Sequence, residues 1–573
     1  MDPSIRRFVT VGLAATLCMS TLRMLGADAL HERVDKLIAA KAAAPGGGPL
    51  APAASDAEFL RRVCLDLNGT IPSSAEARQF LADTASDKRA KLIDHLLASP
   101  DYAAHMAEAF NIMLMERRTH SDAPSQAWLK YLQSCFAANK PWDVMAREIL
   151  CPNPDDETTR YSALFYIRRL EKVGQNPTDY QGLTRDLGRL FMGVDLKCAE
   201  CHNHKYIKDY KQADYQGLFA FVGQTFIRTD VKHPAIGEKP LAAKREYVSV
   251  FHPADKKGTG PRIPFGTEME VPAFPKGQEW ATPPDTKTKS PGVPKFATLP
   301  LLAEQFTKPE NVQFKRNIAN RLWFLMMGRG LIHPLDLAHS ENLPSHPELL
   351  TLLADEFEAM KFDIKALVRE LALSQTYQRS SVLPAGSANV PAESYRVAIG
   401  KRMSGELIAH CGLTASGELE AARQIKEEKP KAKVEAAAGN DDPPGGDEKK
   451  PVKGPIPLPA LYQHFVSAFS GPAGEPEVEF APSVAGALFM SNDQIVLNWL
   501  KPRSGNLVDK LSKLDTPAAI ADELYLSILT RFPTEDERAD VASYLQKQAK
   551  RRDGALGDLA WALMASTEFC LNH

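Results

Sequence analysis

The sequence predicts a mainly α-helical protein: two helical domains with an irregular, partly β insertion between them. Apolar residues repeat at helical spacing early in the chain, as in Leu60, Val63, Cys64 and Leu67, and again beyond residue 300. A stretch rich in Pro, Gly and Lys separates these regions. The 573 residues are 44% hydrophobic and 24% charged, which is typical of a globular protein and excludes a multi-span membrane protein or a wholly disordered chain.

The first 29 residues have the layout of a secretory signal peptide. Arg6 and Arg7 precede an apolar run from Phe8 to Leu22, and small residues follow up to Ala29. The run is shorter than the roughly 20 residues that a membrane-spanning helix needs. We therefore predict an exported protein, periplasmic or in the cell envelope, without a membrane span after signal cleavage.

Residues 30–225 are predicted to form the N-terminal helical domain. Its helices run from about Asp56, and Ser73 with Glu76 has the spacing of a capping box at a helix start. Residues 226–300 form the predicted insertion, with short extended runs at 247–251 and 269–274.

The C-terminal helical domain is predicted in two parts, 301–418 and 457–573. In the first part, Gly328 follows a helical face as a C-terminal cap would, and Ser345 with Glu348 is expected to cap the next helix. In the second part, Thr534 with Glu537 forms another capping box. Residues 419–456 are rich in Glu, Lys, Ala, Pro and Gly, so we expect a disordered linker there.

One motif carries specific chemistry, the C-x-x-C-H sequence formed by Cys198, Cys201 and His202. Thiols three residues apart lie on one side of a helical turn, and each can form a thioether with a porphyrin vinyl group. The histidine that follows can bind the iron as proximal ligand. The motif thus predicts covalently bound haem c, with Cys198, Cys201 and His202 as the cofactor-binding residues.

Other interpretations of this motif remain open. His204 follows two residues after His202, and with the two cysteines the pair makes an S2N2 set suited to tetrahedral zinc. The cysteines could instead form a disulfide in an oxidising compartment. A hydrolytic metal site would need a nearby carboxylate, such as Asp209 or Asp214.

The sequence identifies no distal iron ligand. Four weak candidates are Met192, His233, His252 and His346. Tyr215, Leu218, Phe219 and Val222 form a helical stripe that could wall a porphyrin, although such stripes are more often plain core. The polar residues Arg316, Asn320, Arg321, His333 and His339 are expected to be helix caps and surface ion pairs.

The chain also resembles a known family pair. The segments 59–72, 139–143 and 191–204 are similar to the planctomycete cytochrome-associated domain of unknown function, and 316–323, 328–331, 344–350 and 374–377 are similar to its usual C-terminal partner domain, also of unknown function. The resemblance implies an exported bacterial protein and supports Cys198, Cys201, His202 and His204 as the motif of the first domain. Two departures stand out: the segment 105–111 lacks the family's usual tryptophan and aspartate, and Lys205 replaces a proline.

The leading functional prediction is a cytochrome c-like protein that passes single electrons to an unidentified redox partner protein. The alternative is a non-haem helical scaffold or binding module with a Cys/His structural metal site or a disulfide. A formal net charge of -2 argues against nucleic acid as a partner. Whether the protein is an enzyme stays open at this point.

Overall fold

A computed structural model describes residues 28–118, 125–172, 178–387, 389–425, 456–476 and 484–573. The predicted signal peptide lies outside these ranges except for its last two residues. Residues 426–455 of the predicted linker lie outside them as well.

The mainly α-helical class is confirmed, with 54% of the chain in helices. The helices up to the insertion are α1 (Leu30–Ala43), α2 (Asp56–Asn68), α3 (Ser74–Ala82), α4 (Lys88–Ala98), α5 (Pro100–Met115), α6 (Ser125–Ala137), α7 (Trp142–Leu150), α8 (Leu164–Leu170), α9 (Tyr180–Met192) and α10 (Gln212–Val222). Those after it are α11 (Thr298–Thr307), α12 (Val312–Met327), α13 (Pro347–Ala359), α14 (Ile364–Leu373), α15 (Gly405–Ser416), α16 (Leu419–Arg423), α17 (Leu458–Phe469), α18 (Val484–Asn492), α19 (Gln494–Trp499), α20 (Leu507–Ser512), α21 (Pro517–Leu529), α22 (Glu535–Lys547), α23 (Arg552–Met564) and α24 (Thr567–Cys570).

The insertion is partly β, as predicted. It holds three two-stranded antiparallel sheets, which pair β1 (Thr225–Ile227) with β2 (Ile236–Glu238), β3 (Arg245–Ser249) with β4 (His252–Thr259), and β5 (Trp280–Thr282) with β6 (Val293–Pro294). The expected extended run at 247–251 overlaps the β3–β4 hairpin. The run at 269–274 forms no strand, because its backbone pairs with no neighbouring strand.

Most of the expected caps are present. Ser73 Oγ accepts a hydrogen bond from the backbone N–H of Glu76 at 3.3 Å, and the Glu76 carboxylate accepts one from the backbone N–H of Ser73 at 2.8 Å. Gly328 ends α12 in the left-handed region, with a φ of 80°. The expected Ser345 cap is wrong: Pro347 occupies the first helical position, which suits a residue without an N–H, so His346 becomes the cap residue of α13.

The start of the predicted linker is ordered. Leu419–Arg423 forms α16, in which Ala422 is buried. Glu418, just before this helix, pairs with Arg503 at 2.7 Å. Tertiary contacts thus hold a short helix that the local composition does not predict.

The helices pack around two hydrophobic cores. The first core combines residues from Leu30 to Ile263 with residues from Leu299 to Tyr395 and adds Leu526. The second core runs from Met403 to Phe569 and adds Leu65 and Ile71 from the N-terminal part. The cores therefore divide near residue 400, whereas the sequence-based boundary at residue 300 falls inside the first core.

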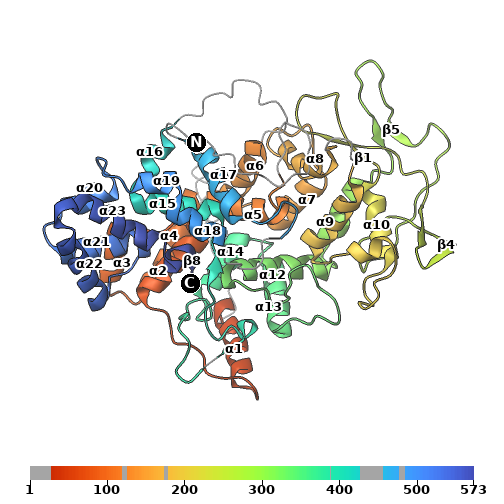
Figure 1. Ribbon diagram of the computed structural model, residues 1–573. Coiled ribbons are helices and arrows are strands. Elements are labelled where there is room, and N and C mark those ends of the chain that lie inside the picture. Colours follow the sequence, from red (N-terminus) through yellow and green to blue (C-terminus); the bar gives the residue numbers. More distant parts are fainter. Residues whose placement is uncertain (1–27, 119–124, 173–177, 388, 426–455, 477–483) are drawn as a thin grey trace, which may run out of the picture.

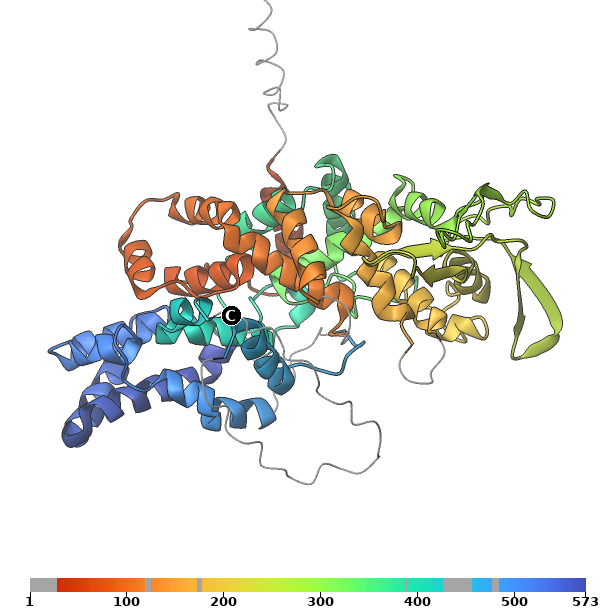
Figure 2. The same cartoon turned by 90° about the horizontal axis from the view of Figure 1, so that it is seen from above.

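The insertion and the last helices lie at opposite ends of the molecule. Figures 1 and 2 show the β1, β4 and β5 region at one end and α20 to α23 at the other. A last two-stranded sheet pairs β7 (Lys401–Arg402) with β8 (Leu571–Asn572), which brings the C-terminus back to the middle. In the described part of the chain, no helix combines the length and apolarity that crossing a bilayer requires.

Candidate functional site

The C-x-x-C-H motif forms a tight surface turn between α9 and α10. Lys197–Glu200 makes one turn of 3-10 helix, η3, and Cys201 ends it. Ala199 is fully buried and fixes the turn to the first core, whereas Cys198 and Cys201 are exposed and carry free thiols. The two predicted attachment points therefore face solvent from one turn.

The backbone of this turn is held on three sides. Before it, Asp195 accepts a hydrogen bond from the backbone N–H of Lys197 at 3.0 Å. From α10, the Gln216 side chain donates to the carbonyl of Glu200 at 2.9 Å. From the β3–β4 hairpin, the Val250 N–H donates to the carbonyl of Cys201 at 3.1 Å. The motif is thus rigidly positioned although its sulfur atoms are exposed.

The His202 ring is oriented so that its Nε2 is available to bind a metal. Its Nδ1 lies 2.6 Å from the carbonyl oxygen of Asn203. A carbonyl only accepts, so Nδ1 carries the proton and donates, which leaves the lone pair on Nε2. A ligating histidine usually donates its other ring N–H in this way.

His204 has a different role. Its Nδ1 accepts hydrogen bonds from the backbone N–H groups of Tyr206 at 3.2 Å and Ile207 at 2.8 Å. A neutral histidine that binds a metal through Nε2 carries its proton on Nδ1. Nδ1 of His204 instead accepts from two backbone donors, so it carries no proton and Nε2 is not free to bind a metal. Among the described residues, no three His, Cys, Asp or Glu side chains form a group that could hold a metal ion.

The remaining sequence candidates do not join the motif. Met192 is buried in the first core, and His346 is buried against Tyr395. Asp209 accepts a hydrogen bond from the Ser340 N–H at 2.6 Å, and Asp214 forms an ion pair with Arg262. In the described part of the chain, neither His233 nor His252 makes a hydrogen bond or ring contact with His202.

The helical stripe on α10 packs in the hydrophobic core and does not form the wall of a porphyrin site. Tyr215, Leu218 and Val222 are buried in the first core, and Phe219 packs against it from a partly buried position. These side chains face the protein interior and do not wall the exposed thiols.

An exposed apolar patch borders the motif instead. Phe251 is 67% exposed and Val250 60% exposed at the tip of the β3–β4 hairpin, and Tyr206 is 74% exposed just after the motif. The Phe251 ring lies 4.8 Å from that of His202, centre to centre. We define these three side chains as the motif patch. Phe251 adjoins His202 in space, and Tyr206 follows the motif in the chain. Exposed apolar side chains beside such a motif are typical of surfaces that a ligand or partner covers.

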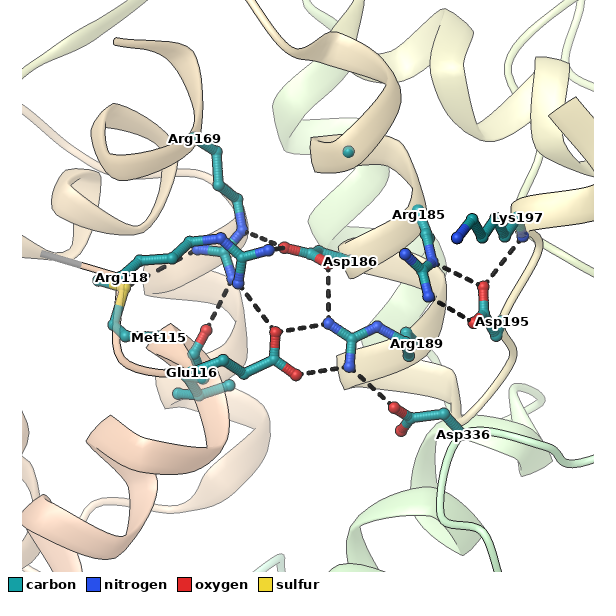
Figure 3. Close-up of polar contacts among 12 residues, drawn as sticks. Met115, Glu116, Arg118, Arg169, Arg185, Asp186, Arg189, Asp195, Lys197 and Asp336 are labelled. Carbon is teal, nitrogen blue, oxygen red and sulfur yellow. Dashed lines mark hydrogen bonds and ion pairs between the residues drawn. The ribbon is translucent and has the colours of Figure 1, made fainter. Parts of the chain in front are cut away.

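A buried charge network holds α9, the helix that leads into the motif (Figure 3). Arg189 is at its centre and donates to Glu116 at 2.6 Å, to Asp186 at 2.8 Å and to Asp336 at 2.8 Å. Arg169 donates to the other oxygen of Asp186 at 2.7 Å. The contacts tie the end of α5, helix α8 and the loop after α12 to α9.

The guanidinium groups of this network favour the charged form of Asp186. Burial alone would raise the pKa of Asp186, but the guanidinium groups around it lower that pKa to about 2. Arg321, which we expected on the surface, is buried and pairs with Asp336. The expectation failed because α12 packs against α9, where Arg321 donates to the Arg189 carbonyl at 2.8 Å, and local sequence does not reveal that contact.

Sequence reasoning missed a second site, a cavity of about 470 Å³ where the two cores meet. Its walls come from α2, α5, α12, α15, α17 and the β7–β8 sheet and are mostly apolar. The polar lining includes His105, Glu108, Glu406, His410 and Asn572. A partly apolar cavity with a few polar groups is the usual form of a small-molecule site.

Two of these groups on α5 have strongly shifted acidity. Burial lowers the pKa of His105 to about 4, so this histidine is neutral near pH 7. Burial and the nearby Glu406 carboxylate raise the pKa of Glu108 to about 7. The spacing of His105 and Glu108 on one helix face was a signal in the sequence, in the same segment that departs from the family pattern.

Comparisons with known proteins identify two domains. Residues 33–226 match the model of PSCyt2, a planctomycete cytochrome-associated family described as a protein of unknown function (DUF1549). Residues 301–545 match that of PSD1, a protein of unknown function (DUF1553). No curated protein and no solved structure matches the chain significantly. The chain therefore belongs to the proteins in which a PSCyt2 (DUF1549) domain is followed by a PSD1 (DUF1553) domain.

Proposed function

We propose that this protein carries a covalent haem c at its C-x-x-C-H motif and transfers single electrons to a partner protein outside the cytoplasm. The observation that carries the proposal is the pair of exposed, free thiols of Cys198 and Cys201 on one rigid turn, followed by a histidine with an available Nε2. The export part of the proposal rests on the signal-peptide pattern of the first 29 residues.

The residues of the turn fit the group that they would hold. Cys198 and Cys201 would each bind one porphyrin vinyl group by addition of S–H across the double bond, which needs no oxidant. His202 would bind the iron through Nε2 while Asn203 keeps its ring oriented. Bound haem supplies one-electron iron chemistry.

The motif patch supports this proposal further. Covering the motif patch would remove the apolar surface of Val250, Phe251 and Tyr206 from water. Such burial is favourable by about 25 cal/mol per Å². A porphyrin at Cys198 and Cys201 would cover apolar side chains in this neighbourhood. The exposed position also suits exchange of electrons with a second protein, because a partner can approach it closely.

The first experiment is expression in a host with and without haem-attachment machinery. With the machinery, we expect a coloured protein whose pigment stays attached under denaturing conditions. Cys201→Ala and Cys198→Ala should lose the covalent pigment, whereas Cys151→Ala, which changes a cysteine outside the motif, should keep it. His202→Ala should keep attached pigment with an altered spectrum, whereas His252→Ala should leave the spectrum unchanged.

Two outcomes would overturn the proposal. A colourless protein with one equivalent of zinc would favour the structural metal site. A colourless protein that contains no metal, and in which both motif thiols resist alkylation until reduced, would favour the disulfide.

A further inference from the structure

The cavity between the two cores contains an acceptor without a donor. Asn572 from β8 lines it and is 3% exposed. Its Nδ2 donates to Asp66 at 2.6 Å, while its Oδ1 is buried without a hydrogen-bond partner in the described chain. An unsatisfied buried carbonyl costs about 1–3 kcal/mol, so the cavity wall carries an uncompensated negative dipole at β8, which favours a positively charged occupant over a negatively charged one.

Glu108 is a second acceptor with spare capacity. Its one hydrogen bond comes from the Asn111 side chain at 3.0 Å, and no ion pair reaches it from the described residues. The neighbouring carboxylate, Glu406, is already held by Arg117. Glu108 is therefore a partly buried carboxyl group with no ion-pair partner among the described residues, and it would gain from a ligand that brings a cation into contact with it.

The other charged groups of the lining also favour a cation over an anion. Lys401, a partly buried base, is paired with both oxygens of Asp66 and donates to the Met326 carbonyl at 2.9 Å. The lining contains four acids against two bases: Asp66, Asp101, Glu108 and Glu406 against Lys401 and Arg402. The histidines add no positive charge near pH 7, since burial lowers the pKa of both His105 and His410.

The volume and the lining of the cavity indicate the size and polarity of the ligand that it would bind. A cavity of about 470 Å³ lies within the range of about 300–1,000 Å³ for small-molecule sites. Side chains such as Ile112, Leu129, Phe324 and Leu407 make its surface largely apolar. The favoured occupant is therefore apolar in its body and polar at one end.

We propose that this cavity binds a small organic amine, with an apolar body against the helix walls and an ammonium group paired with Glu108. The site is separate from the C-x-x-C-H motif, so it adds a binding activity to the proposed electron transfer. Nothing in the argument depends on haem attachment.

The test uses three probes of equal chain length on the full protein: hexylamine, 1-hexanol and hexanoate. Calorimetric titration at pH 7.5 should give at least tenfold tighter binding of hexylamine than of 1-hexanol, with hexanoate the weakest. Glu108→Gln should weaken hexylamine binding at least tenfold and leave 1-hexanol binding unchanged. The variant keeps an acceptor for Asn111, and Glu310→Gln, on an exposed position, serves as the matched control.

The pH dependence gives a readout that a merely structural role of Glu108 would not produce. The titratable and charged groups that interact with Glu108 are Glu406, Arg117 and Tyr462, and the pKa of Glu108 itself is raised to about 7. An alkylammonium stays protonated up to about pH 10, so binding below pH 7 must displace a proton from Glu108. Hexylamine affinity should fall about tenfold per pH unit between pH 7 and pH 5, and this dependence should vanish in Glu108→Gln.

Three outcomes would overturn the proposal. Equal affinity for hexylamine and 1-hexanol would remove the role of charge. Undiminished hexylamine binding in a folded Glu108→Gln protein would place the ammonium elsewhere. Absence of binding by all three probes at millimolar concentration would mean that the cavity is not a ligand site.

Discussion

At the scale of single residues, the buried Glu116 carboxylate is paired with the buried Arg189 guanidinium. Glu116 lies in the left-handed region, with a φ of 47°, which costs a non-glycine residue of order 1–3 kcal/mol. It is held there because its carboxylate takes two hydrogen bonds from Arg189. The strained end of α5 is therefore stabilised by the same side chain that fixes α9.

Replacing the central arginine tests this interpretation. We expect Arg189→Met to lower the free energy of unfolding by about 3–5 kcal/mol, because three buried carboxylates lose a shared partner. The measurement is urea unfolding at pH 7. Arg185→Met is the control, since Arg185 pairs with Asp195 in a partly exposed position, where such a pair is worth about 1 kcal/mol or less. Equal losses in the two variants would contradict the proposed role of burial.

At the scale of elements, α9 and its C-terminal cap connect the two matched domains. Gly193 ends this helix with a φ of 68°. Directly after it, the Asp195 N–H donates to the Asp336 carbonyl at 2.8 Å, and the Ala338 N–H donates to the Gly193 carbonyl at 2.9 Å. A side chain on Gly193 would meet the Asn317 side chain at 2.8 Å. The glycine is thus required both by its conformation and by the close approach of α12.

These two requirements can be separated with paired substitutions. Gly505 also has a positive φ, of 87°, but a Cβ there would meet no atom within 4 Å. We expect Gly505→Ala to cost about 1–2 kcal/mol, the conformational part alone. Gly193→Ala should cost at least about 1 kcal/mol more, because overpacking adds to it. The comparison is made by thermal and urea unfolding, and equal costs would show that the contact with α12 relaxes freely.

At the scale of the whole molecule, the two cores cross the boundary between the matched families. Helices α11 to α14 belong to the PSD1 segment by sequence, yet their apolar faces complete the first core. Helix α2 joins both cores, because Phe59 and Val63 pack in the first and Leu65 packs in the second. Arg61 reaches from the same helix to the carbonyls of Ile528 and Phe569, at 3.1 and 2.9 Å.

This packing predicts how shortened chains behave. A chain of residues 28–300 lacks α12 to α14 and most of α11, and should unfold without a cooperative transition because part of its core faces water. A chain of residues 28–398 retains nearly all of the first core and should unfold cooperatively, at a lower temperature than the full protein. Near-ultraviolet circular dichroism during heating distinguishes the two. Cooperative unfolding of the 28–300 chain would show that the PSCyt2 segment and the insertion form an independent core.

The sequence by itself determined the helical class, the position of the partly β insertion and several helix ends. It could do so because periodicity and capping are local: Ser73 with Glu76, Gly328, and Thr534 with Glu537 each act within a few residues of their own helix. The C-x-x-C-H motif is local in the same sense, since Cys198, Cys201 and His202 share one turn.

Only the tertiary structure decided which helices share a core, why Arg321 is buried and where the cavity lies. Asp66 and Glu108 line that cavity together with Lys401 and Asn572, which follow them in the chain by hundreds of residues. Their contacts depend on how whole helices pack, and packing of this kind leaves no periodic pattern in the chain. The exposed Phe251 beside His202 follows the same rule, because its hairpin folds back onto the motif from a separate segment.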